Sequence, residues 1–199
     1  MVGDRYALPA HERVMLYRGL ATAEQIKARK ARQLTRFDAG SLVAVDGFNV
    51  CRTVGSYLSG NFVFEGLDGF LRDVSEIHRK KLNWDILTRS LQLILGYLKN
   101  HQAGRVHFYF DKPISHSGKM VAHCQLLMQE MKIAGVAETV FSPDYCLREM
   151  DEGIICTADS FVIDTAKRPA FDLAKQVLET NFQPKIFRIK EWLVSRGEE

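Results

Sequence analysis

Three short apolar runs of this chain each end in an aspartate, and this repeated arrangement restricts the folds that the chain can adopt. The aspartates, each with the apolar run before it, are Asp46 (43–45), Asp111 (106–110) and Asp159 (153–158). Amphipathic segments with three- and four-residue apolar spacing lie between the runs. Strands that alternate with helices are typical of a parallel sheet with right-handed crossovers. The sequence therefore predicts an α/β domain whose parallel sheet is flanked by helices.

The first 38 residues form a basic segment, which we expect to be a helical extension before an α/β domain of residues 39–199. Thr22 with Gln25 has the form of a capping box that starts a second helix. Through Arg36 the chain has eight Lys and Arg against three Asp and Glu, although its overall net charge is only +3. The basic cluster consists of Lys27, Arg29, Lys30, Arg32 and Arg36. It could bind RNA phosphates, or it could be a solvated helix face.

Within the α/β domain, the apolar spacing and the turn residues predict further elements. They are a helix over 50–58, a hairpin or extended insert over 61–70, helices after 83 and from about 118, a strand over 136–141, a helix near 170–178 and a strand over 185–188. No repeat or low-complexity segment interrupts this order, so we expect one alternating unit after the extension.

The aspartates that follow the strands are the main candidates for chemistry. The carboxyl ends of strands in an open α/β sheet line the ligand crevice, so we expect Asp46, Asp111 and Asp159 to converge there. Like charges repel unless a cation neutralises them, and carboxylate oxygens are ligands that Mg²⁺ prefers. We expect catalytic roles for Asp46, Asp111, Asp159 and Asp144, and a Mg²⁺ or Mn²⁺ site of Asp46, Asp111, Asp159 and Asp164. Each aspartate could instead be a helix cap or a turn residue.

Four polar residues near the same loops are candidates for binding a phosphodiester substrate. They are Asn49, Arg72, Lys112 and Ser160. The Asn49 amide lies in the first turn beyond Asp46 and could orient that carboxylate, or Asn49 could be an ordinary turn residue. The cations Arg72 and Lys112 could clamp a phosphate, although most Lys and Arg side chains are solvated surface.

Composition and absent motifs exclude several classes of protein. No run approaches the roughly 20 apolar residues needed to cross a bilayer, and the first residues lack a signal pattern, so we expect a cytoplasmic protein without membrane partners. The four cysteines form no C-x-x-C pair, which disfavours a zinc knuckle or a disulfide framework. Neither a G-x-x-x-x-G-K-[ST] loop nor a G-x-G-x-x-G fingerprint occurs, which argues against a nucleotide triphosphatase or a dinucleotide enzyme.

Five segments between about residues 41 and 165 resemble the PIN-like nuclease superfamily, in particular its NYN branch and the uncharacterised domain-of-unknown-function family 434. They are VDGFNV at 45–50, GFLRDVS at 69–75, FDKPIS at 110–115, SPD at 142–144 and TADSFVID at 157–164. The resemblance implies a parallel sheet flanked by helices, a carboxylate-lined pocket and cleavage of RNA that depends on Mg²⁺ or Mn²⁺. The basic amino-terminal helices also look like those that precede the domain in that family.

The chain departs from the NYN pattern at one position. Proteins of that branch usually carry a second aspartate two places after the residue that matches Asp159, and here Phe161 stands there; Asp164 or Asp144 could compensate. Our leading hypothesis is a metal-dependent ribonuclease that acts on single-stranded or structured RNA. The alternative is a non-catalytic RNA-binding module with the same fold. An aspartyl phosphatase is disfavoured, because Phe48 stands where such enzymes carry a second aspartate. The oligomeric state, a homo-oligomer included, stays open.

Overall fold

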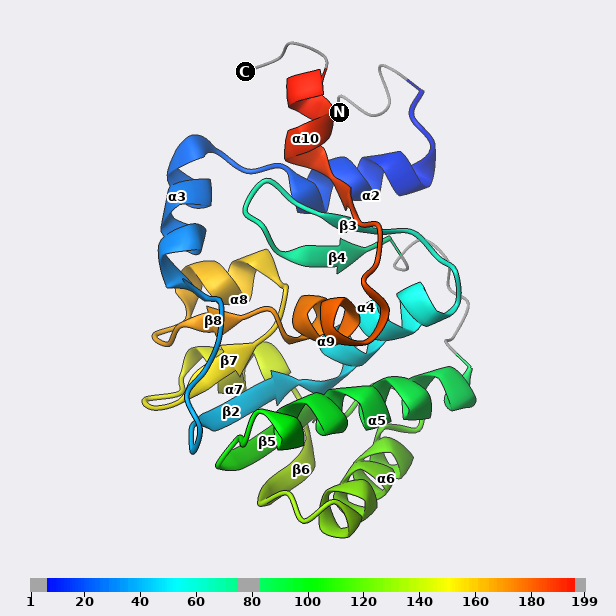
Figure 1. The fold of residues 1–199 in the computed structure, drawn as a ribbon, viewed down its shortest axis with the longest axis vertical. Coiled ribbons are helices and arrows are strands. Elements are labelled where there is room, and N and C mark those ends of the chain that lie inside the picture. The colour runs from blue at the N-terminus through cyan, green and yellow to red at the C-terminus, as the bar shows by residue number, and fades with distance from the viewer. Residues whose placement is uncertain (1–6, 75–82, 196–199) are drawn as a thin grey trace.

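A six-stranded parallel sheet forms the centre of the computed structural model, which describes residues 7–74 and 83–195 (Figure 1). Its strand order is β1-β8-β7-β2-β5-β6. The strands are β1 (Gln33–Leu34), β2 (Leu42–Asp46), β5 (Arg105–Asp111), β6 (Gly135–Val140), β7 (Ile154–Cys156) and β8 (Ala170–Phe171). Every described pairing within this sheet is parallel. The predicted α/β fold is therefore confirmed, and it is consistent with a PIN-like arrangement.

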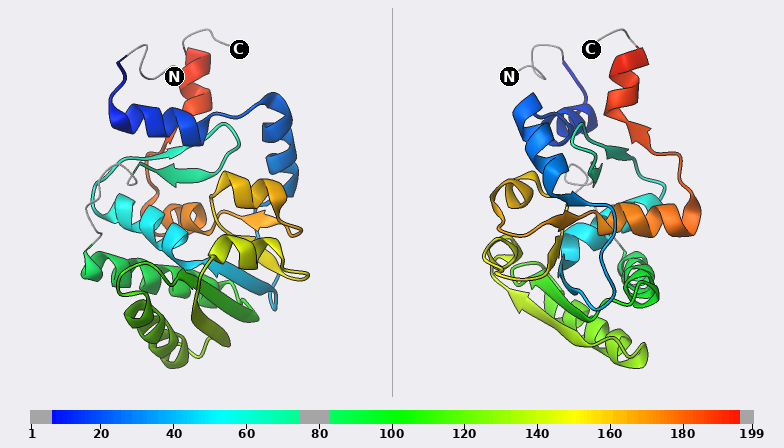
Figure 2. Two further views of the ribbon diagram at one scale, coloured as in Figure 1. Left: turned by 180° about the vertical axis from the view of Figure 1, so that it is seen from behind. Right: turned by 60° about the vertical axis from the view of Figure 1, so that its left-hand side comes forward.

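Helices cover both faces of the sheet (Figure 2). The first face carries α4 (Gly47–Leu58), α5 (Trp84–Asn100), α6 (Ser117–Glu130) and α9 (Leu173–Phe182), and the second carries α7 (Pro143–Arg148) and α8 (Ser160–Thr165). Alternate residues of β2 point to opposite faces, so Val43 and Val45 join the larger core, whereas Ala44 joins the smaller core with α7 and α8. No helix among the described residues is long and apolar enough to span a bilayer.

A second, three-stranded sheet lies beside the first, in the order β4-β3-β9. It contains β3 (Val63–Glu65), β4 (Leu71–Asp73) and β9 (Phe187–Arg188), and it packs with α2 (Ala10–Gly19) and α10 (Ile189–Ser195) around a small core. Of the hairpin or extended insert expected over 61–70, the structure has the hairpin, but its second strand, β4, begins just beyond those bounds. The expected strand over 185–188 is present as β9, but it pairs with β3 and does not join the main sheet. Ser75, at the end of the matched segment 69–75, lies outside the described residues.

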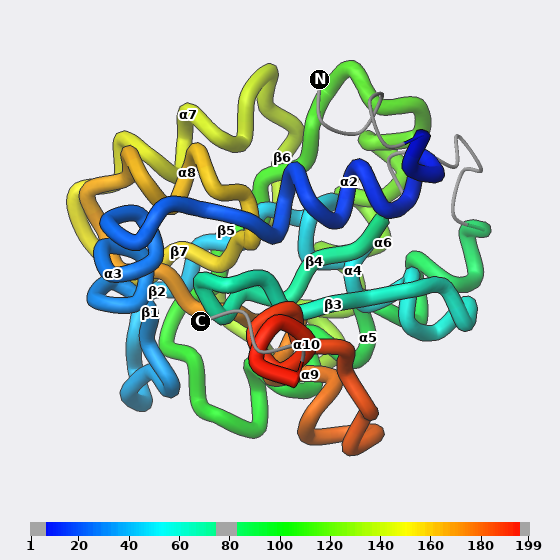
Figure 3. The backbone as a smooth tube through the Cα atoms, turned by 90° about the horizontal axis from the view of Figure 1, so that it is seen from above, coloured from blue at the N-terminus to red at the C-terminus, as the bar shows by residue number. Residues whose placement is uncertain are grey.

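The basic amino-terminal segment is helical up to Arg32, as predicted, but the helical extension expected through residue 38 ends there. Gln25 donates its backbone N–H to Thr22 Oγ1 at 3.3 Å, and Thr22 donates its N–H to Gln25 Oε1 at 3.0 Å, so the capping box of α3 (Ala23–Arg32) is confirmed. The next two residues form β1, the edge strand of the main sheet, which pairs with β8. α3 lies alongside α8 (Figure 3). The extension is thus joined to the domain by both a strand and a helix.

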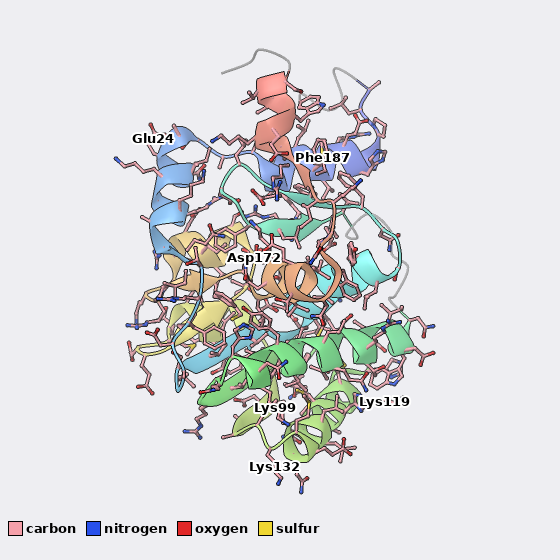
Figure 4. The ribbon with its side chains drawn as sticks, in the orientation of Figure 1. Glu24, Lys99, Lys119, Lys132, Asp172 and Phe187 are labelled. Carbon is pink, nitrogen blue, oxygen red and sulfur yellow. The ribbon has the colours of Figure 1, made fainter. Side chains whose placement is uncertain are left out.

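Two predicted helices begin at different residues in the structure. The helix expected from 50 starts at Gly47, because Asp46 itself is the amino-terminal cap. The helix expected near 170 starts at Leu173, because Ala170–Phe171 forms β8 and Asp172 then caps α9 by accepting the backbone N–H of Lys175 at 3.0 Å. Figure 4 labels Asp172 in the interior of the molecule, at the start of α9.

Candidate carboxylate site

Parallel pairing brings the aspartates that end the central strands to one edge of the sheet. In the register of β2 with β5, Asp46 lies opposite Tyr109, two residues before Asp111. On the other side of β2, Val45 lies opposite Cys156, so the loop that carries Asp159 leaves the sheet beside Asp46. Asp144 follows β6, whose Val140 pairs with Asp111. The predicted catalytic aspartates therefore come from neighbouring strand ends.

Asp46 is the buried member of this group. The pKa of Asp46 is raised from 3.8 to about 7, mainly by burial; a backbone hydrogen bond from Asn49 opposes the rise, and the charges of Asp111, Asp144 and Asp159 contribute to it. Asn49 donates its N–H to Asp46 Oδ1 at 3.2 Å, which caps α4. At Gly47 a Cβ atom would lie 2.4 Å from Cε1 of the Phe110 ring, so a side chain cannot fit beside the carboxylate. Asp46 thus caps a helix, and its carboxyl group is costly to ionise in this environment.

Asp159 also combines two roles. Its Oδ1 accepts the backbone N–H groups of Phe161 at 2.8 Å and Val162 at 3.1 Å, so it caps α8, while its Oδ2 takes no part in the cap. Thr157 supports the same loop: its hydroxyl donates to Asp46 Oδ2 at 3.3 Å and accepts the backbone N–H of Asp159 at 3.2 Å. One threonine therefore connects two of the candidate carboxylates.

Asn49 is a bridge between two loops. Its side-chain oxygen accepts the backbone N–H of Ala158 at 3.0 Å, which ties the start of α4 to the loop after β7. The expected role of Asn49 in orienting Asp46 falls to its backbone N–H, which donates to that carboxylate. The contacts of Asn49 hold the site together, so its side-chain oxygen is already engaged by the protein.

The donor chemistry of the group fits a hard divalent cation, because all its candidate ligands are carboxylate oxygens. Burial raises the pKa of Asp111 and of Asp144, and in Asp144 the charges of Asp159 and Asp111 add to this effect. Across residues 7–74 and 83–195, however, no three His, Cys, Asp or Glu side chains lie close enough to form a ready ligand group. The carboxylates are therefore close enough to influence one another's pKa, but they are spaced too widely to form a complete set of metal ligands.

Arg72 lies within a buried ion pair instead of at the surface. It is 1% exposed, and it donates from Nη1 and Nη2 to the two oxygens of Asp68 at 2.6 and 2.7 Å. Its Nε donates to the backbone carbonyl of Ala158 at 3.0 Å, and Nη2 also reaches Ser160 Oγ at 3.1 Å. Arg72 thus fixes the loop that carries Asp159 and is not available to a phosphate at the surface.

Asp164 and Ser160 belong to the same network. Arg29 donates to both oxygens of Asp164, to Asp68 Oδ2 at 2.9 Å and to Ser160 Oγ at 3.3 Å. Burial opposes ionisation of Asp68, but the hydrogen bonds and charges of Arg72 and Arg29 outweigh it and hold the pKa of that carboxyl below its ordinary value. The structure places Asp164 on Arg29 and not with the group around Asp46.

Asp68 is the residue that sequence analysis overlooked. It binds two arginines at once, and it also accepts the backbone N–H of Phe70 at 3.2 Å. The sequence signal that could have identified it is its i,i+4 spacing to Arg72, although 66–70 reads only as a glycine-punctuated turn. Asp68 therefore connects the hairpin, the amino-terminal helix and the loop after β7.

The remaining predicted cations divide into surface and structural groups. Lys112 is exposed, and its Nζ lies 4.7 Å from the centre of the Phe141 ring. Within the basic cluster, Lys27, Lys30 and Arg36 are exposed, whereas Arg29 is buried. Arg32 donates to the backbone carbonyl of Arg168 at 3.3 Å. Three members of the cluster are thus presented to solvent.

Comparisons with known proteins give a family but no activity. Over 182 residues the chain is 27% identical to an uncharacterised protein of Methanocaldococcus jannaschii, in a match that covers 89% of this chain and 85% of the relative. No solved structure matches the chain. A family model described as a domain of unknown function, DUF5616, matches residues 38–176, which include every candidate carboxylate described above. The chain therefore belongs to the DUF5616 family.

Proposed function

We propose that this protein is a ribonuclease that hydrolyses phosphodiester bonds with Mg²⁺ or Mn²⁺ at the Asp46 edge of the sheet. The observation that carries the proposal is the environment of Asp46. A buried carboxylate beside three other carboxylates, with a pKa of about 7, is costly to ionise without a compensating cation. Helix capping accounts for Asp46 and Asp159 one by one, but it does not require four carboxylates to meet at neighbouring strand ends.

The four carboxylates act together in this proposal. Asp46, Asp111, Asp144 and Asp159 would hold one or two divalent ions. When bound, such ions activate water for in-line attack and neutralise charge on the leaving oxygen. Thr157 and Asn49 fix Asp46 and the loop of Asp159, so the two carboxylates keep one relative position as substrate binds. Exposed Lys112 lies at the rim, where it can attract the RNA backbone.

A second candidate is the non-catalytic RNA-binding module. The open arrangement of the carboxylates in the described residues favours it, and so does Phe161 at the position where NYN proteins usually carry an aspartate.

For either candidate we propose a reducing compartment, the cytoplasm. The four cysteines are free, and three of them are buried.

Thermal unfolding with and without divalent ions tests the metal site, and cleavage tests the chemistry. Saturating Mg²⁺ or Mn²⁺ should raise the melting temperature of the unmutated protein, because an ion that binds only the folded state stabilises it. Asp46→Asn and Asp111→Asn should each lose that gain, whereas Asp151→Asn, at an exposed loop, should keep it. If the melting temperature stays the same and varied single-stranded and structured RNAs are bound but not cleaved, the binding module replaces the nuclease.

A further inference from the structure

Three exposed aromatic rings flank the carboxylate edge. Phe141 is 78% exposed, Tyr145 is 62% exposed and Phe161 is 57% exposed. Large apolar side chains on a protein surface are ordinary when scattered singly, but a group beside a candidate site is a sign of binding. The question is therefore what these rings contact.

The backbone of each aromatic residue lies next to a residue that carries a candidate carboxylate. Phe141 directly follows Val140, which lies opposite Asp111 in the sheet. Tyr145 is the neighbour of Asp144 in the first turn of α7. Phe161 donates its backbone N–H to Asp159 Oδ1 at 2.8 Å. Thus all three rings lie along the same edge as the proposed reaction.

Cations lie over two of the rings. Lys112 Nζ is 4.7 Å from the centre of Phe141, and Arg148 Cζ is 4.9 Å from the centre of Phe161. Each cation lies over one face of its ring, and the exposure of Phe141 and Phe161 leaves ring surface for a flat base whose anionic phosphate contacts the cation. Aromatic and arginine side chains are also enriched at protein–protein interfaces, but lysine and aspartate are depleted there, whereas Lys112 and the candidate carboxylates adjoin these rings. Charge and shape together favour nucleic acid as the occupant.

We infer that Phe141, Tyr145 and Phe161 form a base-stacking platform for unpaired nucleotides, with Lys112 and Arg148 on the adjoining phosphates. Bases in a duplex are already stacked and paired, so only single-stranded RNA can present a free base face to these rings. This inference rests on the proposed function, because it places the substrate over the same carboxylates. It also gives Phe161 a role: where NYN proteins usually carry a carboxylate, this chain carries a stacking surface.

Binding of a short oligouridine, roughly 10 nucleotides long, tests the inference separately from cleavage. Fluorescence anisotropy is measured in Ca²⁺, and a denaturing gel checks that the RNA remains intact. Phe141→Ala, Tyr145→Ala and Phe161→Ala should each weaken binding by at least about fivefold, the lower end of what one base–aromatic stack contributes. Phe161→Trp should retain affinity and Phe161→Leu should lose it, since leucine keeps the apolar surface but has no ring face.

Two controls identify stacking as the cause. Leu126→Ala removes a side chain that is 51% exposed on α6. Leu126 lies in the second half of that helix, which leads away from the carboxylate edge. The variant should therefore bind RNA as the unmutated protein does. An abasic ribose–phosphate chain should bind the unmutated protein and the alanine variants equally weakly. An oligonucleotide with 2-aminopurine should lose fluorescence on the unmutated protein and lose less on the variants.

The outcomes separate this inference from the nuclease proposal. RNA affinity that does not change in the three alanine variants, equal affinity for a duplex, or no binding by the unmutated protein overturns the platform. The first of these results would instead indicate a surface for a protein partner. Ring-dependent binding without cleavage in Mg²⁺ or Mn²⁺ leaves the platform and rejects the nuclease, whereas cleavage that is independent of the rings does the reverse.

Discussion

Arg29 and Asp164 form a two-point ion pair, with Arg29 Nε 2.7 Å from Asp164 Oδ1 and Arg29 Nη2 2.6 Å from Asp164 Oδ2. The hydrogen bonds to Asp164 raise the pKa of the Arg29 guanidinium. Because both carboxylate oxygens already have a partner, Asp164 is a structural residue that joins α3 to α8. Asp159, whose Oδ2 is outside its helix cap, is the stronger candidate for a metal ligand in the same segment.

Asp159→Asn should therefore affect mainly the rate of RNA cleavage, whereas Asp164→Asn should affect mainly the stability of the fold. In single-turnover assays, Asp159→Asn should slow RNA cleavage by at least roughly 100-fold, with little change in RNA affinity, because it removes an interaction needed in the transition state. The asparagine oxygen can still cap α8. Asp164→Asn should keep most of the cleavage rate but lower the free energy of unfolding by roughly 1–3 kcal/mol, since it weakens a charged hydrogen-bonded pair. A large loss of cleavage in a fully folded Asp164→Asn protein would reverse the assignment.

Asp46 should make the stability of the metal-free protein depend on pH. Its pKa in the folded state, about 7, lies above the ordinary 3.8, so the folded state binds the proton more tightly than the unfolded state. The free energy of unfolding should thus fall as the pH rises from about 4 to about 7 and level off above that. In EDTA, Asp46→Asn should be roughly 2–4 kcal/mol more stable than the unmutated protein at pH 8, and should match it near pH 4.

Urea unfolding at several pH values measures this difference directly. Saturating Mg²⁺ should remove the advantage of Asp46→Asn, because the ion binds the ionised carboxylate and favours its folded form. An Asp46→Asn protein that is less stable than the unmutated one at every pH would mean that the carboxylate acts chiefly as the cap of α4.

Arg72→Met should destabilise the fold strongly. It leaves Asp68 buried with one arginine instead of two and removes the hydrogen bond to the Ala158 carbonyl. Loss of one partner from a buried ion pair typically costs about 3–5 kcal/mol. Lys167→Gln is the matched control: it breaks pairs with Glu149 and Asp151 in which Lys167 is 53% exposed and screened by solvent, so it should change the melting temperature little. Equal melting temperatures for the two variants would contradict this account of Arg72.

The amino-terminal cluster should contribute to RNA binding only through its exposed members. Replacing Lys27, Lys30 and Arg36 by glutamine should weaken binding of all single-stranded sequences alike and reduce the salt slope by about 0.7 for each lost phosphate contact. The melting temperature should barely change. Arg29→Gln, in contrast, should lower the stability of the fold because it removes the ion pairs of Arg29 with Asp68 and Asp164. An unchanged salt slope in the triple variant would identify these side chains as ordinary solvated surface.

The strands and the position of Asp46 could be predicted from the sequence because their signals are local. An apolar run that ends in aspartate marks both the strand and its last residue, and parallel pairing then sets which ends meet. Arg72 could not be placed in this way. Its partner carbonyl at Ala158 lies 86 positions away, and no periodicity encodes that contact. The two-residue strands β1 and β8 were also missed, since β1 directly follows α3 and β8 continues directly into the cap of α9.

The central position of β2 has a consequence for how the molecule assembles. This strand pairs with β5 on one side and with β7 on the other, and the hydrogen bond from Thr157 to Asp46 spans 111 positions of the chain. Such distant parallel pairing requires a large loop to close before any contact compensates for the lost entropy, so folding should be slow. The strand-end carboxylates approach one another only when that loop closes. Their repulsion opposes the closing of that loop, so under the proposed function a divalent ion present during refolding should speed it.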